Sequence, residues 1–206
     1  GTSAGDIIEG LEGNDLMRGL GGGDRFVIAG TDLGFDIYIG GTGIDRILGS
    51  AENDIIGLAG SPRNLSGIEI IDGGGGFDVL RFGSSGRQGP GSSDNIINLT
   101  DIELTGIELI SAGGGDDRIT GSHGDDRIRG GMGGDMFVFR GVFANDTIID
   151  FNTGTTRSPI QDVINLRAFD FASFATVMAN ASEQDGSTLI DLGEHGSILL
   201  EGILML

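Results

Sequence analysis

Apolar residues in this chain recur at a fixed distance from aspartate. In eleven segments an Asp is followed two residues later by an apolar or aromatic residue, and the positions beside that residue include charged side chains such as Arg25 and Arg46. The apolar residues are Ile8, Met17, Phe26, Tyr38, Ile47, Ile56, Leu80, Ile119, Ile128, Phe137 and Ile148. Alternation around one apolar residue is typical of a very short strand with one buried face. The pattern predicts a series of short strands whose inward side chains share one core.

The eleven segments are copies of a nine-residue unit. Glycine recurs at its first, second and fourth places, as in Gly73 to Arg81, and glycine permits the positive φ that a sharp turn needs. Asp fills the sixth place in Asp6, Asp15, Asp24, Asp36, Asp45, Asp54, Asp78, Asp117, Asp126, Asp135 and Asp146. The copies cover residues 1–57, 73–81 and 112–149. Six residues of turn and three of strand bury little alone, so successive units must stack.

The composition narrows the classes of partner. The 206 residues include 41 Gly, 31 Asp or Glu and only 12 basic residues, for a formal charge of -19. This charge argues against nucleic acid and against an anionic membrane surface, because both would repel the chain. Cysteine is absent, which excludes disulfides and thiolate metal sites. No run of 18 apolar residues occurs, so the sequence predicts no membrane span.

Stacking would bring the sixth-place aspartates together. Adjacent layers lie about 4.8 Å apart, and carboxylates at that spacing repel one another strongly unless a cation lies between them. Carboxylate and backbone carbonyl oxygens are ligands for hard cations, and flexible loops suit Ca²⁺ better than Mg²⁺. The residues themselves therefore predict several Ca²⁺ sites.

The unit resembles the nonapeptide GGxGxDxUx of the RTX (repeats-in-toxin, haemolysin-type) calcium-binding family. The resemblance implies an all-β fold, a right-handed parallel β-roll (an RTX solenoid) in which two units make one turn of about eighteen residues. Each Ca²⁺ would then lie between loops one coil apart. The implied pairs are Asp6 with Asp24, Asp15 with Asp36, Asp24 with Asp45, Asp36 with Asp54, Asp117 with Asp135, and Asp126 with Asp146.

The resemblance also implies which residues hold the metal. They are Asp6, Asp15, Gly19, Gly21, Asp24, Asp36, Gly40, Gly41, Gly43, Asp45, Asp54, Gly73, Gly74, Gly76, Asp78, Gly113, Gly115, Asp117, Gly121, Gly124, Asp126, Gly130, Gly131, Gly133, Asp135 and Asp146. A three-residue insertion at 28–30, Glu52 at a fourth place and the apolar loop 142–144 depart from the motif. These departures predict weak or empty sites at Asp36, Asp54 and Asp146.

The remaining chain divides into a middle and an end. Residues 58–111 lack regular nonapeptides, but 65–71 recurs as 104–110, and both copies predict full strands with Ile68, Ile70, Ile107 and Leu109 on one face. We therefore expect one solenoid over 1–149, interrupted at 58–111; the alternative is a domain boundary in the Gly- and Ser-rich loop 83–93. Residues 150–206 predict a small mixed cap with strands at 148–151 and 162–166, a helix at 171–181 and a hairpin over 187–200.

The end of the chain resembles the C-terminal region of proteins exported by type I secretion in Gram-negative bacteria. The terminal residues 201–206, an acid followed by apolar residues, are similar to that signal. Together with the repeats, this implies a secreted, extracellular module that folds on binding Ca²⁺ and has the type I secretion machinery as a partner. Because the chain does not begin with Met, we expect an upstream domain of a larger protein.

Two other functional classes stay open. The chain could be the C-terminal part of a secreted protease, lipase or mannuronan epimerase, with catalysis upstream, because the sequence shows no catalytic set. It could also be a surface adhesin, since Arg25 and Arg46 stack on one sheet and could contact an acidic polysaccharide. Gly1 to Gly5 matches the GxSxG nucleophile motif, but it is in phase with the repeat and leads into Asp6, so we interpret it as a calcium loop.

Overall fold

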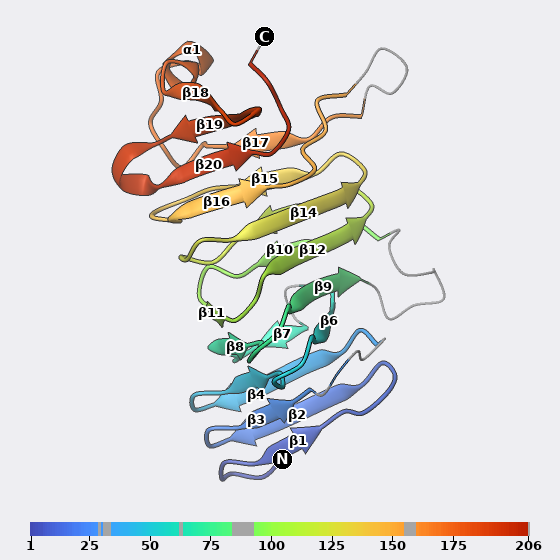
Figure 1. The fold of residues 1–206 in the computed structure, drawn as a ribbon. Coiled ribbons are helices and arrows are strands. Elements are labelled where there is room, and N and C mark those ends of the chain that lie inside the picture. The colour runs from blue at the N-terminus through green and yellow to red at the C-terminus, as the bar shows by residue number, and fades with distance from the viewer. Residues whose placement is uncertain (29, 31–33, 62–63, 84–92, 155–159, 206) are drawn as a thin grey trace.

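Short strands stack in coils from the N-terminus at one end of the molecule to the C-terminus at the other (Figure 1). The computed structural model describes residues 1–28, 30, 34–61, 64–83, 93–154 and 160–205. Neighbouring coils pair in parallel, which confirms the predicted all-β parallel roll. Within the described residues, no helix has the length and apolar character needed to cross a membrane.

The N-terminal coils alternate between two parallel sheets. A five-stranded sheet contains β1 (Ile7–Glu9), β3 (Arg25–Val27), β5 (Arg46–Leu48), β8 (Ile70–Asp72) and β11 (Glu103–Thr105) in that order. A three-stranded sheet contains β2 (Leu16–Gly21), β4 (Ile37–Thr42) and β7 (Leu65–Ser66). Arg25 lies opposite Arg46, so these two side chains do share one sheet as the repeat predicted.

The C-terminal coils use two other sheets. A four-stranded sheet contains β10 (Ile96–Asn98), β13 (Arg118–Thr120), β15 (Met136–Val138) and β17 (Val163–Asn165). The parallel part of an eight-stranded sheet contains β6 (Ile55–Ala59), β9 (Val79–Gly83), β12 (Leu109–Gly114), β14 (Arg127–Met132) and β16 (Asn145–Ile148). Because β6 and β9 pair with each other and β9 pairs with β12, this sheet runs across the stretch that lacks regular nonapeptides.

The length of a coil changes along the solenoid. Ile7 lies opposite Arg25 and Ile110 opposite Ile128, which are the eighteen-residue spacings of two nonapeptides. In the middle the chain visits three sheets per coil: β6, β7 and β8 form one such coil, and β9, β10 and β11 the next. The alternative boundary within 83–93 falls largely on residues 84–92, which lie outside the described residues.

The core is the column of side chains that the periodicity predicted. Ten of the eleven eighth-place residues are buried, and Phe26, Tyr38 and Ile47 are completely so. Ile8 is only half-buried because it belongs to the first coil and has a neighbour on one side alone. Phe26 and Tyr38 meet edge to face with ring centroids 5.6 Å apart, which links the two N-terminal sheets.

The prediction of full strands over 65–71 and 104–110 is wrong. Each copy instead contains a short strand, a turn and the start of another strand, with Gly67 and Gly106 at positive φ in the turns. The fully buried residues are therefore Ile71 and Ile110, one place beyond the face that the sequence suggested. Each copy is a shortened repeat unit rather than a continuous strand.

A small mixed structure covers the C-terminal end of the eight-stranded sheet. It contains α1 (Phe174–Met178), β18 (Ala181–Gln184), β19 (Ser187–Asp191), a 3₁₀ turn at Gly193–His195 and β20 (Ser197–Leu200). The expected hairpin is present as the antiparallel pair β19–β20, and β20 also pairs in parallel with β16. The strand expected at 148–151 lies earlier, at 145–148, the helix is shorter than expected, and β18 was not predicted. An end strand paired in this way leaves no open edge on the last coil of the sheet.

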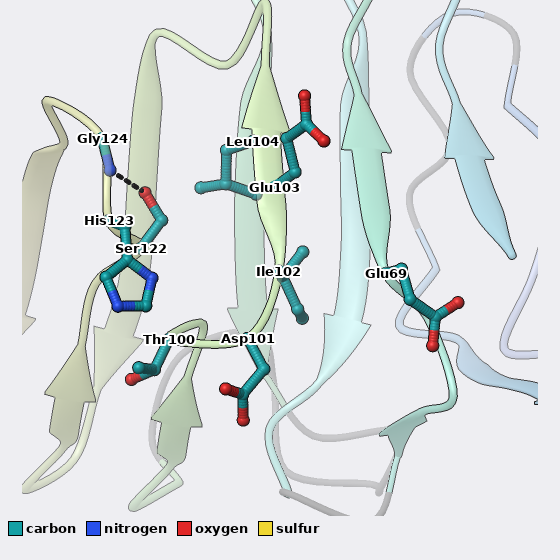
Figure 2. Close-up of a pocket in the computed structure, with 9 residues that line it drawn as sticks. All are labelled: Glu69, Thr100, Asp101, Ile102, Glu103, Leu104, Ser122, His123 and Gly124. Carbon is teal, nitrogen blue, oxygen red and sulfur yellow. Dashed lines mark hydrogen bonds between the residues drawn. The ribbon is translucent and has the colours of Figure 1, made fainter. Parts of the chain in front are cut away.

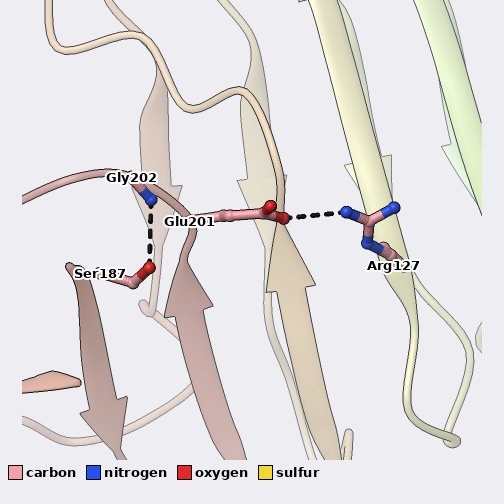
Figure 3. Close-up of polar contacts among 4 residues, drawn as sticks. All are labelled: Arg127, Ser187, Glu201 and Gly202. Carbon is pink, nitrogen blue, oxygen red and sulfur yellow. Dashed lines mark hydrogen bonds and ion pairs between the residues drawn. The ribbon is translucent and has the colours of Figure 1, made fainter. Parts of the chain in front are cut away.

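The last residues of the chain lie against this cap and the roll. Figure 3 shows Glu201 paired with Arg127 of β14 at 3.0 Å, and the Gly202 N–H donating to the Ser187 hydroxyl at 3.1 Å. Both charged side chains are about half exposed, so the ion pair contributes less than about 1 kcal/mol. The backbone bond from the Glu201 N–H to the Ile148 carbonyl (3.0 Å) holds the tail in register with β16.

Candidate metal centre

Sixth-place carboxylates form ladders along the edges of the roll. Most of these Asp residues donate their backbone N–H to a carboxylate one coil further on, as the Asp6 N–H does to Asp24 Oδ1 (2.8 Å) and the Asp24 N–H to Asp45 Oδ1 (2.7 Å). The Asp36 N–H instead donates to the Gly57 carbonyl (3.1 Å). The same bond joins Asp15 to Asp36, Asp54 to Asp78, Asp117 to Asp135 and Asp126 to Asp146 at 2.7–2.9 Å. Stacking the repeats therefore brings acidic side chains together at regular intervals.

Five of the six aspartate pairs expected from the sequence are joined by such a bond. Asp36 and Asp54 do not follow the pattern, because Asp36 lies in register with Leu58 and Asp54 Oδ1 accepts the Gly30 N–H (2.6 Å). The insertion that precedes Asp36 shifts the register of this coil. Asp54 instead donates its own N–H to Asp78, which the sequence had left without a partner.

One carboxylate oxygen in many of these loops is buried without a hydrogen bond. Within the part of the chain that the structure describes, the Oδ2 atoms in question belong to Asp15, Asp24, Asp45, Asp78, Asp117 and Asp135. Asp24 and Asp45 are completely buried. Burying an ionised carboxylate oxygen unpaired costs several kcal/mol, so each atom requires a proton or a cation.

Three other loops satisfy the same oxygen internally. Thr2, Ser50 and Ser122 occupy the second place of their loops, and each donates its backbone N–H and its hydroxyl to Oδ2 of the loop's own aspartate. The nucleophile-like motif at Gly1–Gly5 contains the first of these loops, and the side chain that closes the loop is that of Thr2, not that of Ser3 at the nucleophile position. These loops need no cation to pair the carboxylate.

The backbone at the second place separates the two kinds of loop. The six loops with an unpartnered Oδ2 all have positive φ there, at Leu11, Leu20, Gly41, Gly74, Gly113 and Gly131. At Gly41 the φ is 109° and an added Cβ would overlap the Leu20 carbonyl, so glycine is required on both counts. With positive φ the second-place N–H no longer donates to the loop's own aspartate; the Gly74 and Gly131 N–H groups donate to Asp72 and Asp150 instead.

Backbone carbonyls converge on the same oxygens. A Cβ added at Gly19 would overlap both Asp24 Oδ2 and the carbonyl oxygen of Gly40, which belongs to the next coil. Most of the other glycines expected at metal sites lie in loops with an unpartnered Oδ2, at Gly21, Gly43, Gly73, Gly76, Gly115, Gly130 and Gly133. Gly121 and Gly124 instead lie with Ser122 in the loop that closes on Asp126. Within the described residues no three His, Cys, Asp or Glu side chains group together, and the Gly40 carbonyl beside Asp24 Oδ2 is a further oxygen that an ion there could take. Carboxylate with carbonyl oxygen is the ligand set of Ca²⁺, and the residues present fit that ion.

A protein-family model matches a little over half of the chain. The model is the RTX calcium-binding nonapeptide repeat, in four copies, and it covers residues 1–27, 31–60, 65–81 and 104–137. This chain belongs to the RTX calcium-binding repeat family. Its RTX repeats accordingly bind Ca²⁺, as the stacked carboxylates predicted.

A comparison with solved structures finds an extracellular enzyme. The crystal structure of the extracellular lipase LipA from Serratia marcescens shares 16% sequence identity, with a TM-score of 0.32. The match covers all of the present chain and 37% of the lipase chain. No curated protein matches.

Burial affects the acidity of the RTX aspartates. Loss of solvent raises the pKa of Asp117 to about 7, and the neighbouring charge of Asp135 adds to the increase. The same cause raises the pKa of Asp135 to about 6 and that of Asp146 to about 8. Burial also raises the pKa of Asp45, with the charges of Asp24 and Glu69 acting in the same direction.

These shifts predict that acid stabilises the metal-free roll. A carboxyl group whose pKa rises from 3.8 to about 7 on folding binds more protons in the folded state throughout that window. The unfolding free energy without Ca²⁺ must then fall as pH rises from about 4 to 8. We expect a smaller hydrodynamic radius and a higher denaturant midpoint at pH 5 than at pH 8 in chelator. A metal-free midpoint that rises with pH over this range would contradict the prediction.

Three acidic residues of the ladders were not predicted from the sequence. Glu69 Oε2 accepts the Asp45 N–H (2.8 Å), Glu108 Oε2 accepts the Asp78 N–H (2.6 Å), and Asp162 Oδ1 accepts the Asp135 N–H (2.9 Å). Each stands two residues before a core side chain, as the sixth-place Asp does. That spacing, with Gly67 and Gly106 at the fourth place, is the sequence signal that identifies the two glutamates.

Proposed function

We propose that this chain is a calcium-dependent folding module of a secreted protein. It stays expanded where free Ca²⁺ is scarce and folds into the β-roll outside the cell. The observation that supports the proposal is the set of buried Oδ2 atoms without hydrogen bonds, because the folded state carries them only at a large electrostatic cost when no cation is bound. At a net charge of -19 the metal-free chain also repels itself.

The energetics support a switch of this kind. Extracellular calcium modules have dissociation constants near 10⁻⁴–10⁻³ M. A free Ca²⁺ concentration ten to one hundred times the dissociation constant stabilises the folded state by about 1.4–2.7 kcal/mol per site. Several such sites in one stack amount to a large part of the 5–15 kcal/mol by which domains are usually stable.

Export by the type I route is the second part of the proposal. A chain that does not fold at cytosolic Ca²⁺ levels remains able to thread through a channel, and it folds after it emerges. We propose that the terminal residues, beginning at Glu201, are read by the type I secretion machinery of a Gram-negative bacterium while the chain is unfolded. The tail then docks on the roll through Glu201, which pairs with Arg127, and on the cap through Gly202, which donates to Ser187.

Two repeat loops contain adjacent acidic residues, Asp116 with Asp117 and Asp125 with Asp126, and we propose a structural rather than a catalytic role for them. Asp116 Oδ1 accepts the Gly134 N–H (2.8 Å), and Asp125 Oδ1 accepts the Asn145 N–H (2.9 Å), so both carboxylates join adjacent coils. We propose that any catalysis by the parent protein belongs to another domain of that protein.

Selectivity between Ca²⁺ and Mg²⁺ tests the proposal directly. We expect calorimetric titration at pH 7.5 to show several Ca²⁺ ions bound per chain, with half-saturation between about 0.1 and 1 mM and a simultaneous gain of β signal in circular dichroism. Mg²⁺ should produce less than a tenth of this response at equal concentration, because it requires an octahedral site and releases its water reluctantly. Equal folding by both ions, or folding by neither, would refute the calcium-switch function.

A further inference from the structure

The segments around Glu69 and Glu108 have the same structure. Each begins with a short strand, β7 or β11, turns through a glycine with φ near +60° (Gly67, 61°; Gly106, 59°), and reaches a glutamate directly before β8 or β12. The turn contains three residues where an RTX nonapeptide loop contains six. The side chain is correspondingly one methylene longer than aspartate, which extends its reach.

The glutamate carboxylates occupy the ladder position of an RTX aspartate. They accept the N–H of Asp45 and of Asp78, in the same way that Asp45 accepts the N–H of Asp24. Each glutamate thus lies one coil beyond an aspartate whose Oδ2 is buried without a hydrogen bond. Both aspartates are completely buried.

Carbonyl oxygens of the shortened turns lie close to the unpartnered Oδ2 atoms of Asp45 and Asp78. A Cβ added at Gly40 would overlap both Asp45 Oδ2 and the carbonyl oxygen of Gly67. A Cβ added at Gly73 would overlap both Asp78 Oδ2 and the carbonyl oxygen of Gly106. Both places thus have the same arrangement of a carboxylate oxygen and a carbonyl oxygen as the loop at Gly19, where the ladder consists of aspartates alone.

The loop that contains Asp54 shows how a buried carboxylate can be paired without a cation. Asp54 lies between these two sites in the sequence, and its Oδ2 accepts both the N–H (2.5 Å) and the hydroxyl (2.9 Å) of Ser50. Asp45 and Asp78 have Gly41 and Gly74 in the place of that serine, so their carboxylates lack this closure. The difference lies in the loop and not in the depth of burial, because all three aspartates are completely buried.

From these contacts we propose that the chain holds two further Ca²⁺ ions, one between Asp45 and Glu69 and one between Asp78 and Glu108. The proposal rests on the calcium-dependent folding proposed above and extends it into residues 58–111. Asp45 Oδ2, the Gly67 carbonyl and Glu69 supply oxygen ligands to the first ion. Asp78 Oδ2, the Gly106 carbonyl and Glu108 supply them to the second.

The position of these sites gives them a role in joining the two repeat blocks. They lie where the coil lengthens, with Arg46 opposite Ile70 and Val79 opposite Leu109, and where the chain changes from two strands per coil to three. Ions at these places would clamp the enlarged coils to regular RTX coils on either side. Calcium binding would then order the solenoid as one unit rather than as two.

Charge-neutral substitutions test the assignment. E69Q and E108Q keep an oxygen that can accept the aspartate N–H and remove one ligand charge each. We expect each variant to bind one Ca²⁺ fewer at 1 mM free Ca²⁺ in equilibrium dialysis, or to show at least a tenfold weaker affinity at one site. The double variant E69Q/E108Q should bind two Ca²⁺ ions fewer than the wild type.

Glu103 provides the matched control. Its side chain is exposed on β11, the neighbour of β8, and Figure 2 shows it with Glu69 among the residues that line an open cavity of about 590 Å³. E103Q changes the net charge by the same amount and removes no ladder contact, so its Ca²⁺ number should equal that of the wild type. Equal Ca²⁺ binding by E69Q, E108Q and E103Q would overturn the two sites while leaving the proposed folding function intact. A wild-type chain that binds no Ca²⁺ would overturn both.

Anomalous diffraction from wild-type crystals grown in Ca²⁺ or Tb³⁺ decides the question even where a variant fails to fold. We expect peaks about 2.3–2.6 Å from Asp45 Oδ2 and the Gly67 carbonyl, and from Asp78 Oδ2 and the Gly106 carbonyl. Peaks at Asp24–Asp45 and Asp117–Asp135 with none at the glutamate sites would contradict the proposal.

Discussion

In excess chelator at pH 8, the chain should expand to a radius of gyration of about 50 Å, and 5–10 mM Ca²⁺ should return it to well under half that value. These sizes follow from the scaling of unfolded and compact chains for 206 residues, with the elongated roll somewhat above the compact limit of about 17 Å. The physical reason is the combination of a net charge of -19 with buried, unpartnered carboxylate oxygens, which the folded state tolerates only with bound cations. Small-angle scattering and far-ultraviolet circular dichroism would measure the two states.

Sodium chloride separates specific binding from general screening. At 0.5 M it reduces repulsion between exposed charges, since the Debye length falls to about 4 Å, but it supplies no divalent ligand for a buried oxygen. We expect the chain in chelator and salt to contract only in part and to lack the β signal. A fully folded roll in chelator, with or without salt, would show that the carboxylates do not need calcium.

The fold was predictable because one apolar side chain in each nine-residue unit, at the eighth place, must point into the core. Phe26 and Ile47 stand two places after an Asp and between polar or half-exposed neighbours, and both are completely buried. Periodicity of this kind depends only on local spacing, so it does not require knowledge of tertiary contacts. The parallel stacking then follows because one unit cannot bury its own apolar residue.

The middle of the chain was harder to predict because its apolar residues are more closely spaced. Ile68, Ile70 and Ile71 suggested a continuous strand, and that interpretation concealed Glu69 as a sixth-place residue. The turn at Gly67 breaks the alternation and places Ile71 inward instead. A search for any acid two residues before an apolar position would have found both glutamates.

The difference between open and self-closed loops depends on geometry that a motif does not contain. Ser50 and Ser122 replace the second-place glycine with another small residue, and each supplies a hydroxyl that reaches the loop's own aspartate. Leu20 departs from the motif more obviously, yet it adopts φ of 80° and leaves Asp24 Oδ2 unpartnered. Agreement with the consensus therefore does not by itself predict which loops need a cation.

Alanine substitutions within a single loop should separate metal-site glycines from merely flexible ones. An alanine Cβ at Gly73 would overlap Asp78 Oδ2 and the Gly106 carbonyl, so G73A should displace backbone and block the ion. We expect its unfolding free energy in Ca²⁺ to fall by at least the 1.4–2.7 kcal/mol of one lost site. For a chain of this length that corresponds to a melting temperature lower by roughly 3–10 °C.

Gly75, two residues away, is the control in the same loop. Its nearest neighbour to an added Cβ is the Ala51 carbonyl oxygen at 3.7 Å, an ordinary contact, and its φ lies outside the left-handed region. G75A should change stability by less than about 1 kcal/mol and can even stabilise the roll, because alanine restricts the unfolded chain. Calorimetry in 5 mM Ca²⁺ and in chelator would measure both effects. Equal melting temperatures for G73A and G75A in Ca²⁺ would show that the carbonyl and carboxylate beside Gly73 do not form an ion site. A methyl group placed between two ligand atoms would then have no more effect than one placed in open space.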